Sequence, residues 1–207
     1  MAAMRIGIDF DNTIAGYAAL FRRIAEEAGW LAPGFPGDKK DIRDRIRQQP
    51  DGETLWMRMQ AVAYGSRMGE ACLIDGVAPF LTACRRHGHA VSIVSHKTRT
   101  AAADPDGVDL RRAALDWMEA RRFFAADGFG LRREDVHFAD TRAEKCHRIA
   151  ALGCDLFIDD LEEVFLDPAF PPSVTRLLFH PGEGSPRGPF RVFRDWDALA
   201  RAVLGDG

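Results

Sequence analysis

The stretch that decides the fold stands near the start of the chain, at residues 4–17, and reads MRIGIDFDNTIAGY. A short apolar strand there runs directly into Asp9 and Asp11, which are followed by Asn12 and Thr13. Carboxylates at the end of a buried strand are costly unless something recovers their desolvation. A bound metal ion would recover it, and so would a reaction that needs an anion at this point. The stretch therefore indicates a chemical site at the end of the first strand.

The bulk composition describes an ordinary folded chain. Its 207 residues suit one medium domain, or a core domain that carries a small second one. Because 46% of the residues are hydrophobic and 29% are charged, a sizeable core is expected and disorder is not. The net charge of -3 gives no electrostatic reason to expect nucleic acid or an anionic membrane as the main partner.

Cysteine usage and hydropathy bear on the compartment. The four cysteines have no metal-ligand spacing, and each lies in or beside an apolar segment, so we expect reduced core thiols in a cytoplasmic protein. They are Cys72, Cys84, Cys146 and Cys154. No apolar run is long enough to span a bilayer, and the opening MAAMR is too short and too weakly apolar for a signal peptide.

Apolar segments with strand character alternate with helical patterns along the chain. The segments are residues 5–9, 90–95, 136–139, 156–159, 176–179 and, more weakly, 190–193. Such alternation predicts an α/β fold, Rossmann-like, with a mostly parallel sheet and helices on both faces. Ligands bind such sheets at the carboxyl ends of the strands.

The long gap between the first two strands indicates an insert. Helical patterns fill most of it and are separated by the Pro- and Gly-rich breaks LAPGFPGD and QQPDG. These patterns lie at residues 14–30, 39–49 and 53–68. We expect residues 15–74 to form a small helical cap domain above the carboxyl edge of the sheet, where a lid belongs. Residues 1–14 and 75–207 would form the α/β core.

Four stretches of reactive side chains stand at strand ends or at a helix start. They are DFDNT (9–13), VSHKT (94–98), Lys145 in TRAEKCHRIAAL, and IDD (158–160). A parallel sheet would bring together two acids, a hydroxyl, an ammonium and two further acids. Each stretch also has a plainer reading as turn or helix-capping residues, and Lys97 competes with Lys145 for a phosphate-binding role. The joint pattern favours a site.

In this order, and with a helical insert between the first two, the four stretches resemble the motifs of the haloacid dehalogenase (HAD) superfamily. The matching residues are Asp9, Asp11 and Thr13 of the first motif, Ser95 of the second, Lys145 of the third, and Asp159 and Asp160 of the fourth. The resemblance covers residues 5–166. The place of the insert resembles that of a C1 cap, which implies a C1-capped phosphatase branch.

This resemblance implies a Mg²⁺-dependent phosphomonoester hydrolase that acts on a small phosphorylated metabolite, such as a nucleotide or a sugar phosphate. Asp9 would be the nucleophile and would form an aspartyl-phosphate. Asp11 would protonate the leaving alkoxide and then activate water. Ser95 and Lys145 would bind the phosphoryl group.

The resemblance also implies the metal and phosphate ligands. Asp9 and Asp159 would offer carboxylates to Mg²⁺, and Asp11 its backbone carbonyl. Asp160 would bind the metal through water or orient its neighbours. The expected phosphate-binding set also includes Asn12, Thr13 and His96, although Thr13 suits loop support and His96 an ordinary surface position equally well.

Several functions stay open at this point. Asp11 argues against dehalogenation, which needs a single nucleophilic aspartate. A phosphomutase and a nucleotidase use the same scaffold. The alternative from a different functional class is a non-catalytic HAD-like binding or regulatory domain. That alternative predicts that some motif residues are replaced, and all of them are present in the sequence. Neither the substrate nor the oligomeric state follows from the sequence.

Overall fold

The computed structural model of the chain describes residues 2–37, 39–101 and 107–205. The backbone divides into two compact units. The sheet unit comprises Met1–Ala15, Leu73–Lys97 and Arg121–Gly207, and the helical unit comprises Gly16–Cys72 and Thr98–Ala120. The second segment of the helical unit lies outside the 15–74 insert that we expect from the sequence.

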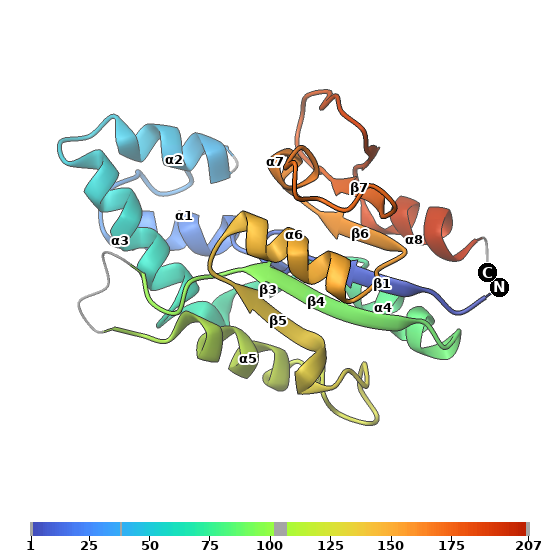
Figure 1. Cartoon of the computed structure of the whole chain (residues 1–207). Helices are drawn as coiled ribbons and strands as arrows, with labels where there is room; N and C mark the ends of the chain where they lie inside the picture. Colours follow the sequence, from blue (N-terminus) through green and yellow to red (C-terminus); the bar gives the residue numbers. More distant parts are fainter. Residues whose placement is uncertain (1, 38, 102–106, 206–207) are drawn as a thin grey trace. The chain divides into compact units, whose positions relative to one another are not determined.

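The sheet unit is built on six parallel strands in the order β5-β4-β1-β6-β7-β8 (Figure 1). These strands are β1 (Arg5–Ile8), β4 (Ala90–His96), β5 (Val136–Ala139), β6 (Leu156–Asp159), β7 (Thr175–Phe179) and β8 (Arg191–Phe193). The predicted parallel α/β sheet is therefore confirmed. Two further strands of two residues each, β2 (Ala15–Gly16) and β3 (Cys72–Leu73), pair with each other and were not predicted.

Helices of the sheet unit cover both faces of the sheet. The helix α6 (Arg142–Ala151) packs on β4 and β5, while α4 (Val77–Arg86) and α8 (Trp196–Leu204) pack against each other on the opposite face (Figure 1). Two short elements, η2 (Arg133–Asp135) and α7 (Glu162–Phe165), complete the unit. The core on the α6 side buries apolar side chains from the strands and from α6, among them Val94, Ile149, Phe157 and Leu178.

The register of the sheet decides which strand ends meet. Ile8 of β1 pairs with Ile158 of β6, so the next residues, Asp9 and Asp159, stand level on neighbouring strands. The backbone N–H of Asp9 donates to the carbonyl of Ile158 at 2.8 Å. On the other side of β1, Ser95 stands two residues beyond Ile93, the partner of Ile8.

The helical unit contains α1 (Ala18–Glu27), α2 (Lys39–Arg47), α3 (Gly52–Tyr64), η1 (Met68–Glu70) and α5 (Leu110–Ala120). Its core is aromatic, with Phe21 stacked on Trp56 and in edge contact with Tyr64. The α3 helix begins at a position that only glycine fits, since a Cβ on Gly52 would lie 2.5 Å from the carbonyl oxygen of Ile46. On α5, the buried Trp117 donates its indole N–H to the carbonyl of Ala71 at 2.9 Å.

Two sequence-based expectations need correction. The helix expected over residues 14–30 is shorter, because residues 10–14 form a loop, Ala15 and Gly16 form β2, and α1 runs only from Ala18 to Glu27. All four cysteines are free, as expected, but Cys72 is exposed and is not a core thiol. It lies on the two-residue strand β3, where its thiol donates to the carbonyl of Gly16 at 3.3 Å. Among the described residues, no helix combines the length and the apolar character that a membrane crossing needs.

Candidate active site

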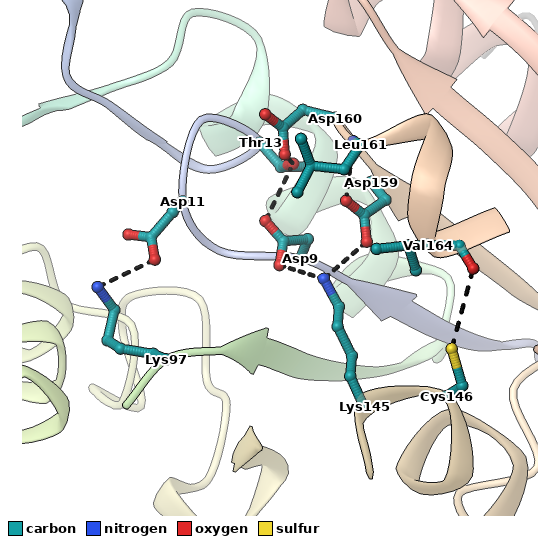
Figure 2. A network of polar contacts seen from close by, with 10 residues as sticks. All are labelled: Asp9, Asp11, Thr13, Lys97, Lys145, Cys146, Asp159, Asp160, Leu161 and Val164. Atoms are coloured by element: carbon teal, nitrogen blue, oxygen red, sulfur yellow. Dashed lines mark hydrogen bonds and ion pairs between the residues drawn. The ribbon is translucent and has the colours of Figure 1, made fainter. Parts of the chain in front are cut away.

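Three motif residues from distant parts of the chain meet in one buried cluster (Figure 2). The ammonium of Lys145 donates to Asp9 Oδ1 at 2.5 Å and to Asp159 Oδ2 at 2.7 Å. The exposed fractions of these residues are 1% for Lys145, 5% for Asp9 and 0% for Asp159. Such strong burial makes the cluster unusual, because buried charges are tolerated only when they are paired or bind a metal.

The charges of this cluster do not balance. Burial raises the pKa of Asp9 to about 7, against the lowering effect of the Lys145 ammonium, and the carboxylates of Asp159 and Asp11 raise it as well. Burial by itself would lower the pKa of Lys145, but the carboxylates of Asp159 and Asp9 raise it above its ordinary value, so the ammonium stays charged. When Asp9 and Asp159 are both ionised, two negative charges face one ammonium, and the raised pKa of Asp9 reflects this excess.

The start of α6 places Lys145. The hydroxyl of Thr141, the N-cap residue, accepts the backbone N–H of Glu144 at 3.1 Å. The carboxylate of Glu144 also accepts the backbone N–H of Asp140, the residue before the N-cap, at 2.9 Å. These two bonds fix where the helix begins. Lys145 therefore leaves the first turn of α6 and is buried against the carboxyl ends of β1 and β6.

The donor set fits a divalent cation. One carboxylate oxygen from each of Asp9, Asp159 and Asp160 lies within 4.8 Å of the others. If these three acids are ionised, Lys145 neutralises only one of them, and a divalent cation would neutralise the other two. Carboxylate oxygens are also the ligands that Mg²⁺ prefers. Backbone contacts steady the set, since the N–H of Leu161 donates to Asp159 Oδ1 at 3.0 Å.

The carboxylate of Asp11 belongs to a second pair, beside this cluster. Lys97, 4% exposed, has its ammonium 2.9 Å from Asp11 Oδ2 (Figure 2). The two motif lysines therefore face different aspartates, Lys145 facing Asp9 and Lys97 facing Asp11. Any oxygen that Asp11 gives to a metal would come from its backbone carbonyl, as the resemblance implies.

The loop between Asp9 and Ala15 is held by its own backbone. The N–H groups of Ile14 and Ala15 both donate to the carbonyl of Phe10 at 2.9 Å. Asn12 takes a positive φ of 61°, which asparagine tolerates better than most residues. The buried hydroxyl of Thr13 lies 3.4 Å from Asp9 Oδ2 and 3.5 Å from Asp160 Oδ1. Thr13 thus links the first and fourth motifs.

Ser95 and His96 end β4 in different surroundings. The Ser95 hydroxyl is buried and has no hydrogen-bond partner among the residues that the structure describes. Such an orphan is uncommon in a folded protein and indicates a missing partner such as a ligand or water. The ring of His96 is exposed, with Nε2 3.0 Å from the carbonyl of Asp140. The side chain of His96 is thus occupied outside the carboxylate cluster.

One residue that supports the first-motif loop was not predicted from the sequence. The indole N–H of Trp196, at the start of α8, donates to the carbonyl of Thr13 at 3.0 Å, and both groups are buried. The apolar pattern of 196–204 carries a helix signal, since Trp196 and Leu199 are buried on one face. Nothing in that pattern, however, relates the helix to the first motif.

Comparisons with known proteins agree with this architecture. The solved structure of a HAD hydrolase, family IA, variant 3, from Entamoeba histolytica is 10% identical, with a TM-score of 0.61 over 99% of this chain and 98% of that one. The HAD-hydrolase YfnB from Bacillus subtilis, in a structure bound to magnesium, is 12% identical, with a TM-score of 0.59 over 100% of both chains. A HAD family hydrolase from Deinococcus radiodurans, with bound phosphate and sodium, is 18% identical, with a TM-score of 0.52 over 98% of this chain and 95% of that one.

No protein-family model and no curated protein matches the sequence. At identities this low, the likeness to solved structures establishes the fold. The chain therefore has the haloacid dehalogenase-like fold, and the resemblance seen in its motifs is confirmed at that level.

Proposed function

We propose that this protein is a Mg²⁺-dependent phosphomonoester hydrolase that acts on a small phosphorylated metabolite through an aspartyl-phosphate on Asp9. The observation that carries the proposal is the buried cluster in which Lys145 bridges Asp9 and Asp159 at the carboxyl edge of the sheet. Buried charges in a cluster with only a structural role are usually paired. This one combines excess carboxylate, an orphan hydroxyl at the end of the next strand and a Mg²⁺-type donor set.

In the first chemical step, a carboxylate oxygen of Asp9 attacks phosphorus and the bond between phosphorus and the ester oxygen breaks. The leaving alkoxide takes a proton from the carboxyl group of Asp11, so the alcohol departs neutral. Lys145 holds Asp9 in place and offsets the negative charge of the phosphoryl oxygens. Lys97, whose ammonium is 2.9 Å from Asp11 Oδ2, orients the Asp11 side chain and stabilises the carboxylate that the proton transfer leaves.

In the second step, a water molecule gives a proton to Asp11 and attacks phosphorus. The acyl phosphate bond breaks, inorganic phosphate leaves, and Asp9 returns to its free carboxylate. Asp9, Asp159, Asp160 and the backbone carbonyl of Asp11 would hold Mg²⁺, which would reduce the repulsion between the anionic phosphate ester and the carboxylates. Ser95, with Asn12, Thr13 and the backbone of His96, belongs to the proposed phosphate-binding set.

The helical unit is the proposed cap. Both of its segments leave the sheet unit directly after a site stretch, since Gly16 follows the first-motif loop and Thr98 follows Lys97. A cap inserted at these points would enclose a small substrate and limit the access of water. The Deinococcus hydrolase with bound phosphate supports the choice of a phosphorylated ligand.

We expect phosphate release from at least one member of a panel of nucleotides, sugar phosphates and phosphorylated small acids. Release should require Mg²⁺ and stop in EDTA, because the buried carboxylates of the site need a cation to accept an anionic substrate. A colorimetric phosphate assay on the purified chain measures both. Release that is equally fast in EDTA would contradict the proposed metal dependence.

Ser95→Ala should weaken phosphate binding without lowering the stability of the fold. The hydroxyl has no partner among the described residues, so its removal should leave the thermal unfolding temperature unchanged or slightly higher. Affinity for inorganic phosphate should fall about tenfold or more, since a hydrogen bond to a charged group is lost. Product-inhibition constants and thermal unfolding test this. Ser92→Ala, on the same strand but level with Gly7, is the matched control and should leave phosphate affinity unchanged. Equal phosphate inhibition of Ser95→Ala and the wild type would remove Ser95 from the site.

A further inference from the structure

Two carbonyl groups of the first-motif loop accept hydrogen bonds from outside the loop. The carbonyl of Thr13 accepts the indole N–H of Trp196 at 3.0 Å, from a residue 183 positions away. The next carbonyl, that of Ile14, accepts the backbone N–H of Ile74 at 2.9 Å. Two consecutive carbonyls are thus fixed by groups of the sheet unit that are remote in the sequence.

The indole of Trp196 has little freedom to move. The ring packs against Phe80 of α4 and Phe179 of β7, with ring centroids 5.0 Å and 5.8 Å away. The carboxylate of Asp195 caps α8 by accepting the N–H of Ala198 at 2.6 Å. Gly76 makes room for the tryptophan, because a Cβ at that position would lie 2.5 Å from the Cβ of Trp196.

Thr13 connects this support to the acids. Its carbonyl is bound by Trp196, while its hydroxyl lies 3.4 Å from Asp9 and 3.5 Å from Asp160. A shift of the Thr13 backbone would therefore move the hydroxyl away from two carboxylates of the donor set. Asn12, the preceding residue, has a positive φ of 61°, a conformation that few residues other than glycine and asparagine adopt.

We propose that Trp196 is a positioning residue for the metal site, acting through the carbonyl of Thr13. The inference rests on the proposed function, because it assumes that Asp9, Asp159 and Asp160 hold a cation. Removal of the indole N–H leaves a buried carbonyl without its donor, and the loop then moves to find another partner. The acids lose their relative placement, and affinity for the cation falls.

The chain supplies a matched control. Trp117 of α5 is also buried and also donates its indole N–H to a backbone carbonyl, that of Ala71, at 2.9 Å. It belongs to the helical unit, and the four acids of the motifs belong to the sheet unit. Trp196→Phe and Trp117→Phe therefore both remove an indole N–H that donates to a buried backbone carbonyl. Only Trp196→Phe removes the donor to a carbonyl of the first-motif loop.

The test is titration of the full chain with Mg²⁺ by calorimetry, together with thermal unfolding in EDTA and, once a substrate is found, kcat and KM. Both variants should unfold at somewhat lower temperatures in EDTA. Only Trp196→Phe should weaken Mg²⁺ binding, by about tenfold or more, as is usual when a group that orients metal ligands is lost. At subsaturating Mg²⁺, the fold decrease in kcat of Trp196→Phe should exceed the fold change in its KM.

Three outcomes would overturn the inference. Wild-type affinity for Mg²⁺ in Trp196→Phe would show that the indole contributes only packing and that its hydrogen bond does not position the acids. Equal weakening in both variants would show general softening of the fold. Absence of Mg²⁺ binding by the wild type would overturn the proposed function and this inference with it. If Trp196→Phe does not fold, benzothienylalanine at position 196 keeps the two-ring shape without the N–H, and the same criteria apply.

Discussion

Asp9→Asn is expected to lower phosphate release by at least about a thousandfold, because an amide oxygen cannot replace the attacking carboxylate. The fold should survive. Burial raises the pKa of Asp9, which means that its ionised form costs stability in the metal-free protein. The neutral amide removes that cost, so the free energy of unfolding in EDTA should not fall.

Phosphate-release rates and urea unfolding, both on purified protein, measure the two halves of this prediction. Asp155→Asn is the control, since Asp155 precedes β6 at the opposite edge of the sheet and accepts the N–H of Arg5 at 2.7 Å. It should keep wild-type activity. Substantial turnover by Asp9→Asn would refute the assignment of Asp9 as the nucleophile.

Lys145→Met should give the largest loss of stability. The substitution leaves Asp9 and Asp159 buried without their shared ammonium, and breaking a buried ion pair in this way typically costs about 3–5 kcal/mol. Turnover should also be lost, because Asp9 is no longer held and the phosphoryl charge is no longer offset. Added Mg²⁺ should recover part of the stability by supplying positive charge to the same carboxylates.

Urea unfolding of Lys145→Met in EDTA and in Mg²⁺ tests this prediction. Lys97→Met is the matched comparison, since Lys97 is also buried but pairs with Asp11, whose side chain is 20% exposed. It should lose less stability and gain less from Mg²⁺. Equal losses in the two lysine variants, with no effect of Mg²⁺, would mean that the buried cluster is not a cation site.

The sheet could be predicted because its strands are short apolar runs that alternate with helical patterns. The strand ends that carry Asp9, Ser95 and Asp159 follow from the same reading, since parallel strands present their carboxyl ends at one edge. Helix α4 was not predicted, although Val77, Phe80, Leu81 and Cys84 have helical spacing and Pro79 lies in its first turn, where proline is tolerated.

The features that could not be predicted from the sequence depend on tertiary packing. No local signal shows that Trp196 reaches the carbonyl of Thr13, because the two residues meet only when α8 packs on the sheet. Which aspartate each lysine contacts likewise depends on tertiary structure, on where α6 begins for Lys145 and on where β4 ends for Lys97. The clustering of Thr98–Ala120 with the helical unit depends on the burial of α5 residues such as Trp117, which a linear pattern does not assign to a partner. The role of this unit as a cap stays a proposal.

The measurement that tests the central claim most directly is a crystal structure of the protein grown with Mg²⁺ and beryllium fluoride, which mimics a phosphoryl group and needs no known substrate. We predict beryllium bonded to a carboxylate oxygen of Asp9, with fluorides near Ser95 and Lys145 and Mg²⁺ on Asp9 and Asp159. An anion seated at Lys97, or a site that binds neither Mg²⁺ nor the fluoride at saturating concentrations, would contradict the account.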